Sequence, residues 1–117
     1  MIQSFEALIL ILQVQLTAEE RVGGVAYAID RPVAAGTRLD FPGTVIEFPA
    51  EAYIAFIDGE PTANWGHSAR YVLVTRDTGD VRSIHTRLPP FRREAGLHWR
   101  VIYKAPSVPE AAVAVPQ

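Results

Sequence analysis

The sequence predicts an all-β fold, with room for one short helix, in the form of a single-domain antiparallel sandwich or small barrel of about seven strands. Three observations lead to this class. Short apolar or alternating segments recur along the 117 residues, turn-forming residues separate them, and no segment shows a convincing long helical period. A chain of this length can bury a sufficient core without a metal or a disulfide.

Residues 7–16 form the most apolar run, and their alternation predicts a strand. Its core-facing side chains are expected to be Leu8, Leu10, Leu12, Val14 and Leu16. The alternative is a helix with one apolar stripe, formed by Ile2, Phe5, Ile9, Leu12 and Leu16. At about ten residues the run is too short to span a bilayer, which needs roughly 20.

The next elements are short strands with turns between them. Residues 17–24 read as a polar connection that ends at Gly23-Gly24, and residues 25–29 as a strand. Strands at residues 38–41 and 44–48 flank the Pro42-Gly43 turn. Residues 52–57 are expected to form a buried strand because they are almost entirely apolar and partly aromatic.

The clearest structural signal is a hairpin. Strands are predicted at residues 71–75 and 81–87, and the Asp77-Thr78-Gly79 segment between them suits a short loop in which Gly79 takes a positive φ. Residues 97–104 then alternate apolar and polar side chains, which predicts an amphipathic strand.

The hairpin sequence Tyr71-Val-Leu-Val-Thr-Arg-Asp-Thr-Gly-Asp-Val-Arg-Ser-Ile84 resembles the hairpin that ends PepSY-type modules and some protease propeptides. In both, an aromatic and aliphatic strand leads into an acidic-Thr-Gly turn and a second strand. The resemblance covers about fourteen of the 117 residues. The helix that such modules place before the hairpin is not recognised, so no family membership follows.

We expect one β-rich domain at residues 1–104 and a Pro/Ala-rich tail at residues 105–117. The tail contains three prolines and has no apolar periodicity. It is therefore expected to be extended or disordered unless a partner holds it.

Composition excludes several classes of site and partner. The chain has no cysteine, which excludes disulfide frameworks, thiolate zinc sites and cysteine nucleophiles. Its net charge of −2 predicts no bulk attraction to nucleic acid or to an anionic membrane. No basic residue precedes Arg21, as a secretory signal would require. We therefore expect a cytoplasmic protein with no membrane span.

The charge is divided unevenly along the chain. Residues 1–69 carry three basic and nine acidic residues, a net charge of −6, whereas residues 70–104 carry eight basic and three acidic residues, a net charge of +5. The two parts are expected to neutralise each other within one fold. The alternative is that an arginine-bearing face meets an acidic partner or a second subunit.

The densest polar cluster is the loop that contains Asn64, Trp65, His67 and Ser68, with Arg70 just beyond it. Loops on a rigid sheet often carry binding groups, so these five residues are candidate ligand or partner contacts. The structural alternative is that Trp65 closes one end of the core while His67 and Asn64 bond backbone groups. Arg92 and Arg93 form a second candidate contact, suited to a carboxylate or phosphate.

Catalytic and metal-binding signatures are not found. The three histidines His67, His85 and His98 are separated by 18 and 13 positions, unlike the close pairs typical of zinc sites. Ser68, His67 and Asp58 offer the groups of a hydrolase, but no Gly-x-Ser-x-Gly elbow surrounds the serine. We expect no cofactor and no metal, and we assign no catalytic residue.

The leading functional hypothesis is a non-enzymatic protein-interaction module: an accessory, inhibitory or assembly subunit. It would bind another protein, or copies of itself, through strand edges, the Trp65 loop and the C-terminal tail. The alternative is a small β-barrel that binds or transforms a small molecule around Asn64, Trp65, His67 and Arg70. Nucleic-acid binding through the arginines of the second half ranks third.

Overall fold

The computed structural model describes residues 1–64, 66–91 and 97–114, and within them the chain is mostly β, as predicted. The helices are α1 (Phe5–Gln15) and α2 (Ala18–Gly23), with a 3-10 turn, η2, at Glu110–Ala112. The strands are β1 (Val25–Ile29), β2 (Arg38–Phe41), β3 (Thr44–Glu47), β4 (Ala52–Asp58), β5 (Ala69–Thr75), β6 (Val81–Thr86) and β7 (Trp99–Lys104).

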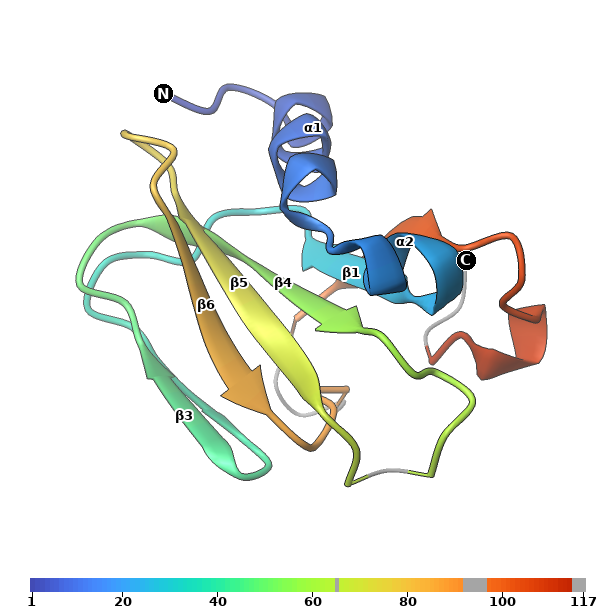
Figure 1. The fold of residues 1–117 in the computed structure, drawn as a ribbon. Helices are drawn as coiled ribbons and strands as arrows, with labels where there is room; N and C mark the ends of the chain where they lie inside the picture. Colours follow the sequence, from blue (N-terminus) through green and yellow to red (C-terminus); the bar gives the residue numbers. More distant parts are fainter. Residues whose placement is uncertain (65, 92–96, 115–117) are drawn as a thin grey trace.

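These seven strands form two antiparallel sheets in the part of the chain that is described. Five of them make one sheet in the order β6-β5-β4-β1-β7, and β2 and β3 make a separate hairpin. Helix α1 and the β2–β3 hairpin lie on opposite sides of the large sheet (Figure 1). The large sheet therefore buries both of its faces, and the hairpin completes a sandwich-like packing on one of them.

The core between the two sheets is aromatic. Phe41 of the hairpin stacks on Tyr71 of β5, with ring centroids 5.0 Å apart, and Phe91 meets Phe56 edge-on at 5.6 Å. The core on the other sheet face is aliphatic and contains Leu8, Leu12 and Leu16 from the N-terminal segment. Ile54, Phe56 and Tyr71 are fully buried in the first core, as expected for the central strands β4 and β5.

The predicted strand at residues 7–16 is wrong, because this segment forms helix α1. Ser4 caps the helix, and its Oγ accepts a hydrogen bond of 3.1 Å from the Ala7 amide. Leu8, Leu12 and Leu16 are buried at a spacing of four, whereas Leu10 is 66% exposed. A run that is apolar at almost every position fits both the helical period of about 3.6 residues and the strand period of about two, so alternation alone could not separate helix from strand.

A second correction concerns residues 17–24, which were predicted to be a polar connection. They contain helix α2, which starts with a capping box: Thr17 Oγ1 accepts from the Glu20 amide, and Glu20 Oε1 accepts from the Thr17 amide at 2.8 Å. The Thr-x-x-Glu spacing was the available signal. No helix within the described residues is long and apolar enough to cross a membrane.

Residues 105–114 of the predicted tail pack on the domain, which corrects the expectation of an extended or disordered segment for this part. Ala105 and Val108 are buried in the aromatic core. The Ala105 amide donates to Gly24 O at 2.9 Å, and the Ala114 amide donates to the Tyr27 hydroxyl at 3.0 Å. Composition suggested disorder, but these backbone contacts and two buried side chains hold the segment in place.

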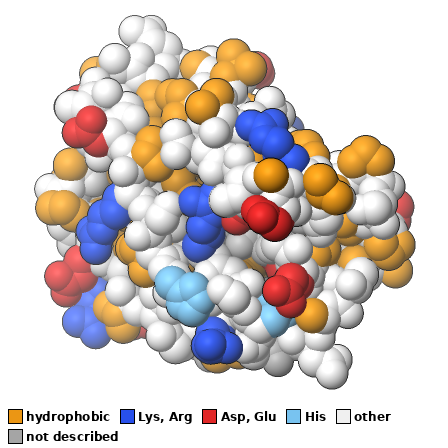
Figure 2. Space-filling view, in the orientation of Figure 1, with side chains coloured by type: hydrophobic (Ala, Val, Ile, Leu, Met, Phe, Trp, Pro, Cys, Tyr) orange, Lys and Arg blue, Asp and Glu red, His pale blue; other side chains and the backbone are white. Residues whose placement is uncertain are grey.

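Ion pairs join the acidic first part of the chain to the basic second part. Arg70 pairs with Glu20 at 2.7 Å, Arg76 with Glu51 at 2.9 Å and Arg100 with Asp30 at 4.0 Å. On the face shown in Figure 2, basic and acidic side chains are interspersed and do not form a large patch of one sign. Much of the uneven charge is therefore neutralised within the fold, as expected.

Candidate functional site

The predicted loop cluster begins at the end of β4, where Asp58 is buried. His67 Nε2 lies 2.7 Å from Asp58 Oδ1, and the two side chains are only 8% and 4% exposed. The other ring nitrogen, Nδ1, lies 2.8 Å from the Asn64 carbonyl oxygen. Asp58 Oδ1 also accepts from the Glu60 amide at 2.9 Å. His67 thus ties its own loop to the end of the strand.

These contacts favour the protonated form of His67. The Asn64 carbonyl can only accept, so Nδ1 carries a proton, and an ionised Asp58 can only accept, so Nε2 carries one as well. Burial lowers the pKa of His67, but the hydrogen bonds to Asn64 and Asp58, together with the charges of Asp58 and Glu60, outweigh it and leave the pKa raised. The protonated imidazole can donate from both nitrogens to Asn64 and Asp58, and this is the form that the raised pKa favours.

We predict that this pair makes stability depend on pH. Because the His67 pKa is raised in the folded state, its contribution is fully present below the unfolded pKa of about 6.5 and is lost as pH rises through the folded pKa. The free energy of unfolding, measured by urea denaturation, should fall as the pH rises above about 6.5. His67→Gln should remove this component, whereas His98→Gln, at an exposed position, should retain it. An unchanged pH profile in His67→Gln would contradict the assignment.

The side chains of Ser68 and Arg70 make contacts with β6 and helix α2. Ser68 Oγ lies 2.8 Å from His85 Nε2 on β6. Arg70 makes a fork with Glu20: its Nε donates to Oε2 at 2.9 Å and its Nη2 to Oε1 at 2.7 Å. Nη2 also donates to the Gln15 carbonyl at 2.8 Å, and Nη1 donates to Ser83 Oγ at 2.9 Å.

These groups border an open hollow of about 480 Å³ between α2 and the β5–β6 hairpin. Its polar lining includes Glu20, Glu60, Ser68, Arg70 and His85. Burial raises the pKa of Glu20, but the hydrogen bonds to Arg70 and Thr17 and the charge of Arg70 outweigh it, so the pKa is lowered and Glu20 is ionised. The guanidinium is therefore already matched by a carboxylate, which leaves it little capacity for an added anion.

The structure brings together only two of the three groups of the hydrolase arrangement, His67 and Asp58. His67 bonds Asp58, while Ser68 bonds a different histidine, His85. Among the described residues, no group of three or more His, Asp or Glu side chains is placed to hold a metal ion. The predicted candidates Trp65, Arg92 and Arg93 lie outside the described residues.

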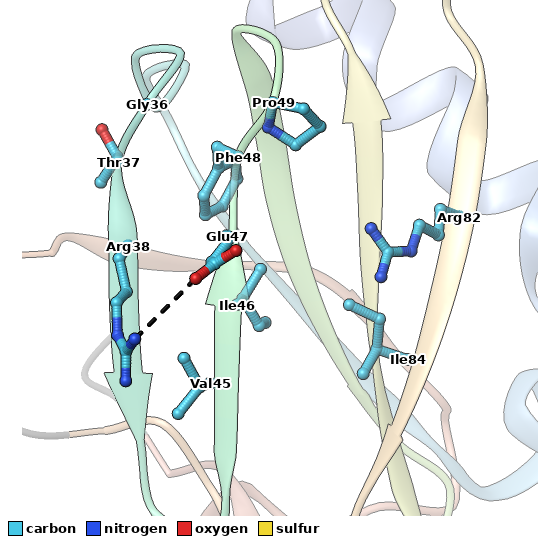
Figure 3. Close-up of a pocket in the computed structure, with 10 residues that line it drawn as sticks. All are labelled: Gly36, Thr37, Arg38, Val45, Ile46, Glu47, Phe48, Pro49, Arg82 and Ile84. Carbon is cyan, nitrogen blue, oxygen red and sulfur yellow. Dashed lines mark ion pairs between the residues drawn. The ribbon is translucent and has the colours of Figure 1, made fainter.

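A larger open surface lies between β3 of the β2–β3 hairpin and β6 of the β5–β6 hairpin (Figure 3). In the described part of the chain, β6 pairs only with β5 and β3 pairs only with β2. At one end a hydrogen bond of 2.8 Å joins the hydroxyls of Thr44 and Thr86. Beyond it the strands border a groove of about 680 Å³, which we call the edge groove.

The hydrogen-bonding direction of β6 follows from its ladder with β5. The Thr75 amide donates to Asp80 O at 2.9 Å, so these two residues form a hydrogen-bonded pair. Hydrogen-bonded and non-hydrogen-bonded pairs alternate along an antiparallel ladder, so Arg82, Ile84 and Thr86 also bond β5. The main-chain N–H and C=O groups of Val81, Ser83 and His85 therefore point away from β5. Within the described residues these groups have no partner strand, and an edge of this kind can pair with a strand from another chain.

The lining of the edge groove combines apolar and charged side chains. Val45 and Ile84 supply apolar surface, whereas Ile46 and Phe48 border the groove but are buried in the core. Arg38 and Glu47 pair across β2 and β3 at 3.8 Å. Arg82 extends from β6 into the groove (Figure 3), and no hydrogen bond or ion pair engages its guanidinium within the described residues. Arg38, Glu47 and Arg82 give the charged side chains of this groove a net charge of +1, and the hollow that adjoins it beyond Val81 also carries Asp80.

Sequence reasoning named neither the edge groove nor Arg82, although the polar pattern of residues 81–86 was consistent with an exposed edge strand. Comparisons with protein-family models, with curated proteins and with solved structures find no match to this chain.

Proposed function

We propose that this chain is a non-enzymatic protein-interaction module, an accessory, inhibitory or assembly subunit that adds an extended segment of a partner to strand β6. The observation that carries the proposal is that one edge of β6, beside the edge groove, pairs with no strand among residues 1–64, 66–91 and 97–114. Addition of a strand to such an edge gives affinity through main-chain hydrogen bonds, and neighbouring pockets add side-chain selectivity.

The length of the edge suits this mode. Strand β6 has six residues, close to the usual length of a strand in a globular protein. A second hollow of about 220 Å³ shares Phe48, Pro49 and Arg82 with the edge groove and extends it past Val81. A partner segment can therefore follow the whole edge from Val81 toward Thr86.

A small-molecule site around the Asn64 loop has less support. The donors of His67 and Arg70 are engaged by Asn64, Asp58 and Glu20. A ligand at these side chains would have to displace short charge-assisted hydrogen bonds, which are among the stronger ones in proteins. The same residues are well suited to a structural role.

Ser83→Pro tests the proposal because it removes one outward N–H without removing a donor from the β5–β6 ladder. A library of displayed random peptides would be selected on the wild-type chain, and the enriched peptides measured on the variants. We expect Ser83→Pro to weaken them roughly tenfold, since one hydrogen bond is lost and the proline ring blocks the edge.

Ser83→Ala is the matched control. Both variants lose the bond between Ser83 Oγ and Arg70, but only the proline removes the backbone donor. Circular dichroism and thermal unfolding would show that both variants are folded, as proline is tolerated on an edge strand. Equal binding to Ser83→Pro and Ser83→Ala, or the absence of any enriched peptide, would refute strand addition at β6.

A further inference from the structure

We infer that the segment accepted by the edge groove is an extended stretch of another protein with the order aliphatic, any residue, acidic, and that it runs antiparallel to β6. This inference rests on the proposed function and specifies its partner. It follows from the direction of the free edge, from the residues that share the groove face of β6, and from the charge of Arg82, which has no ion-pair partner among the described residues.

The groove face of β6 is set by alternation along the strand. Arg82, Ile84 and Thr86 point to one face, where Thr86 meets Thr44 of the hairpin and where Arg82 and Ile84 line the groove. Ser83 and His85 point to the opposite face, where they bond Arg70 and Ser68. A partner strand paired to β6 therefore places every second side chain in the groove.

On a paired partner strand, the side chains opposite Arg82 and Ile84 come closest to β6. Val81, Ser83 and His85 would exchange main-chain hydrogen bonds with the partner, so Arg82 and Ile84 fall in non-hydrogen-bonded pairs. In such pairs the Cα atoms are about 4.5 Å apart and the side chains are nearest. The residue opposite Arg82 thus meets a guanidinium with no ion-pair partner within the described residues, whereas the residue opposite Ile84 meets the half-buried side chain of Ile84 itself.

These two positions give the order of residues. An antiparallel partner passes Ile84 first and Arg82 two residues later, which yields an aliphatic residue, a spacer and an acidic residue. Antiparallel pairing is slightly more stable per residue than parallel pairing, which favours this direction. Glu47 does not neutralise Arg82, because it pairs with Arg38.

Charge also argues against a second copy of this chain as the occupant. Two β6 strands paired antiparallel about Ser83 would set Arg82 opposite Ile84, and the strand from Val81 to Thr86 contains no carboxylate. An acidic segment from a different protein supplies the missing charge, in keeping with the preference for opposite charges directly across a ladder.

The test uses capped synthetic peptides and fluorescence anisotropy. The probe Thr-Thr-Val-Thr-Glu-Thr-Thr is compared with versions that carry Gln or Lys in place of Glu, and with the reversed order Thr-Thr-Glu-Thr-Val-Thr-Thr. We expect the Glu probe to bind the wild-type chain roughly two- to fivefold tighter than the Gln probe. Arg82→Gln should abolish this preference, and Arg82→Glu should favour the Lys probe. Arg100→Gln, an equal change of charge on the distant strand β7, should retain the wild-type preference.

The outcomes separate the inference from the proposed function. If the Glu, Gln and Lys probes bind equally but Ser83→Pro weakens them all, strand addition stands and the acidic preference is overturned. Tighter binding of the reversed probe overturns the antiparallel direction. If no probe binds the wild-type chain, both proposals fail. A dimer in light scattering that dissociates in Ser83→Pro would place a second copy at the edge and overturn the inference.

Discussion

Replacement of Leu8 by alanine is expected to lower the free energy of unfolding by about 2–5 kcal/mol, the usual cost of deleting a large buried aliphatic side chain. Leu8 is 0% exposed and packs from helix α1 onto the large sheet. The loss combines the transfer of the side chain from water with the cavity left between helix and sheet. Urea denaturation of the full chain measures it directly.

Leu10→Ala is the matched control, since the residue type, the helix and the substitution are the same. Leu10 is 66% exposed, so its loss should change stability by no more than about 0.5 kcal/mol. A strand at residues 7–16 would instead place Leu8 and Leu10 on one buried face, and the two substitutions would then cost similar amounts. Equal losses would therefore contradict the helix.

Arg70→Met is expected to cost about 3 kcal/mol, because it leaves the Glu20 carboxylate partly buried without its partner. The Glu20 side chain is 12% exposed and that of Arg70 21%. The substitution also removes the donors to the Gln15 carbonyl and to Ser83. These contacts connect α1, α2, β5 and β6, so the loss should appear as a lower urea midpoint in the full chain.

Two further variants show whether the buried charge is the cause. Combining Arg70→Met with Glu20→Leu should recover part of the loss, since no charge is then left unpaired. Arg76→Met removes the partner of Glu51 in a pair that is much more exposed to solvent, and its effect should be clearly smaller. If Arg76→Met costs as much as Arg70→Met, burial of the pair does not explain the effect.

The strands were predictable because their signals are local. Pro42-Gly43 and Asp77-Thr78-Gly79 mark two turns, and Gly43 and Gly79 adopt positive φ values of 73° and 76°. The apolar run at residues 52–57 has its counterpart in β4, which is buried along its whole length. In each case the residues that define the element are neighbours in sequence, so pattern and turn chemistry suffice.

The predicted loop cluster was only partly informative, because its contacts are made over long separations. Arg70 bonds Glu20, fifty positions earlier, and Ser68 bonds His85, seventeen positions later. Residue types alone indicated that the loop is rich in polar groups. They could not indicate that its donors would be engaged within the fold, which depends on which strands become neighbours.

The sequence by itself determined the β-rich class, the position of the central strands and the principal turns, since these follow from local apolar periods and from glycine and proline. Only the tertiary structure decided whether residues 7–16 form a helix, because an almost uniformly apolar run fits either period until a sheet face selects one. It also decided that, in the part of the chain that is described, β6 is an edge whose Arg82 has no ion-pair partner beside the edge groove. Strand order and ion pairing depend on contacts between distant residues, for which a single sequence carries no local signal.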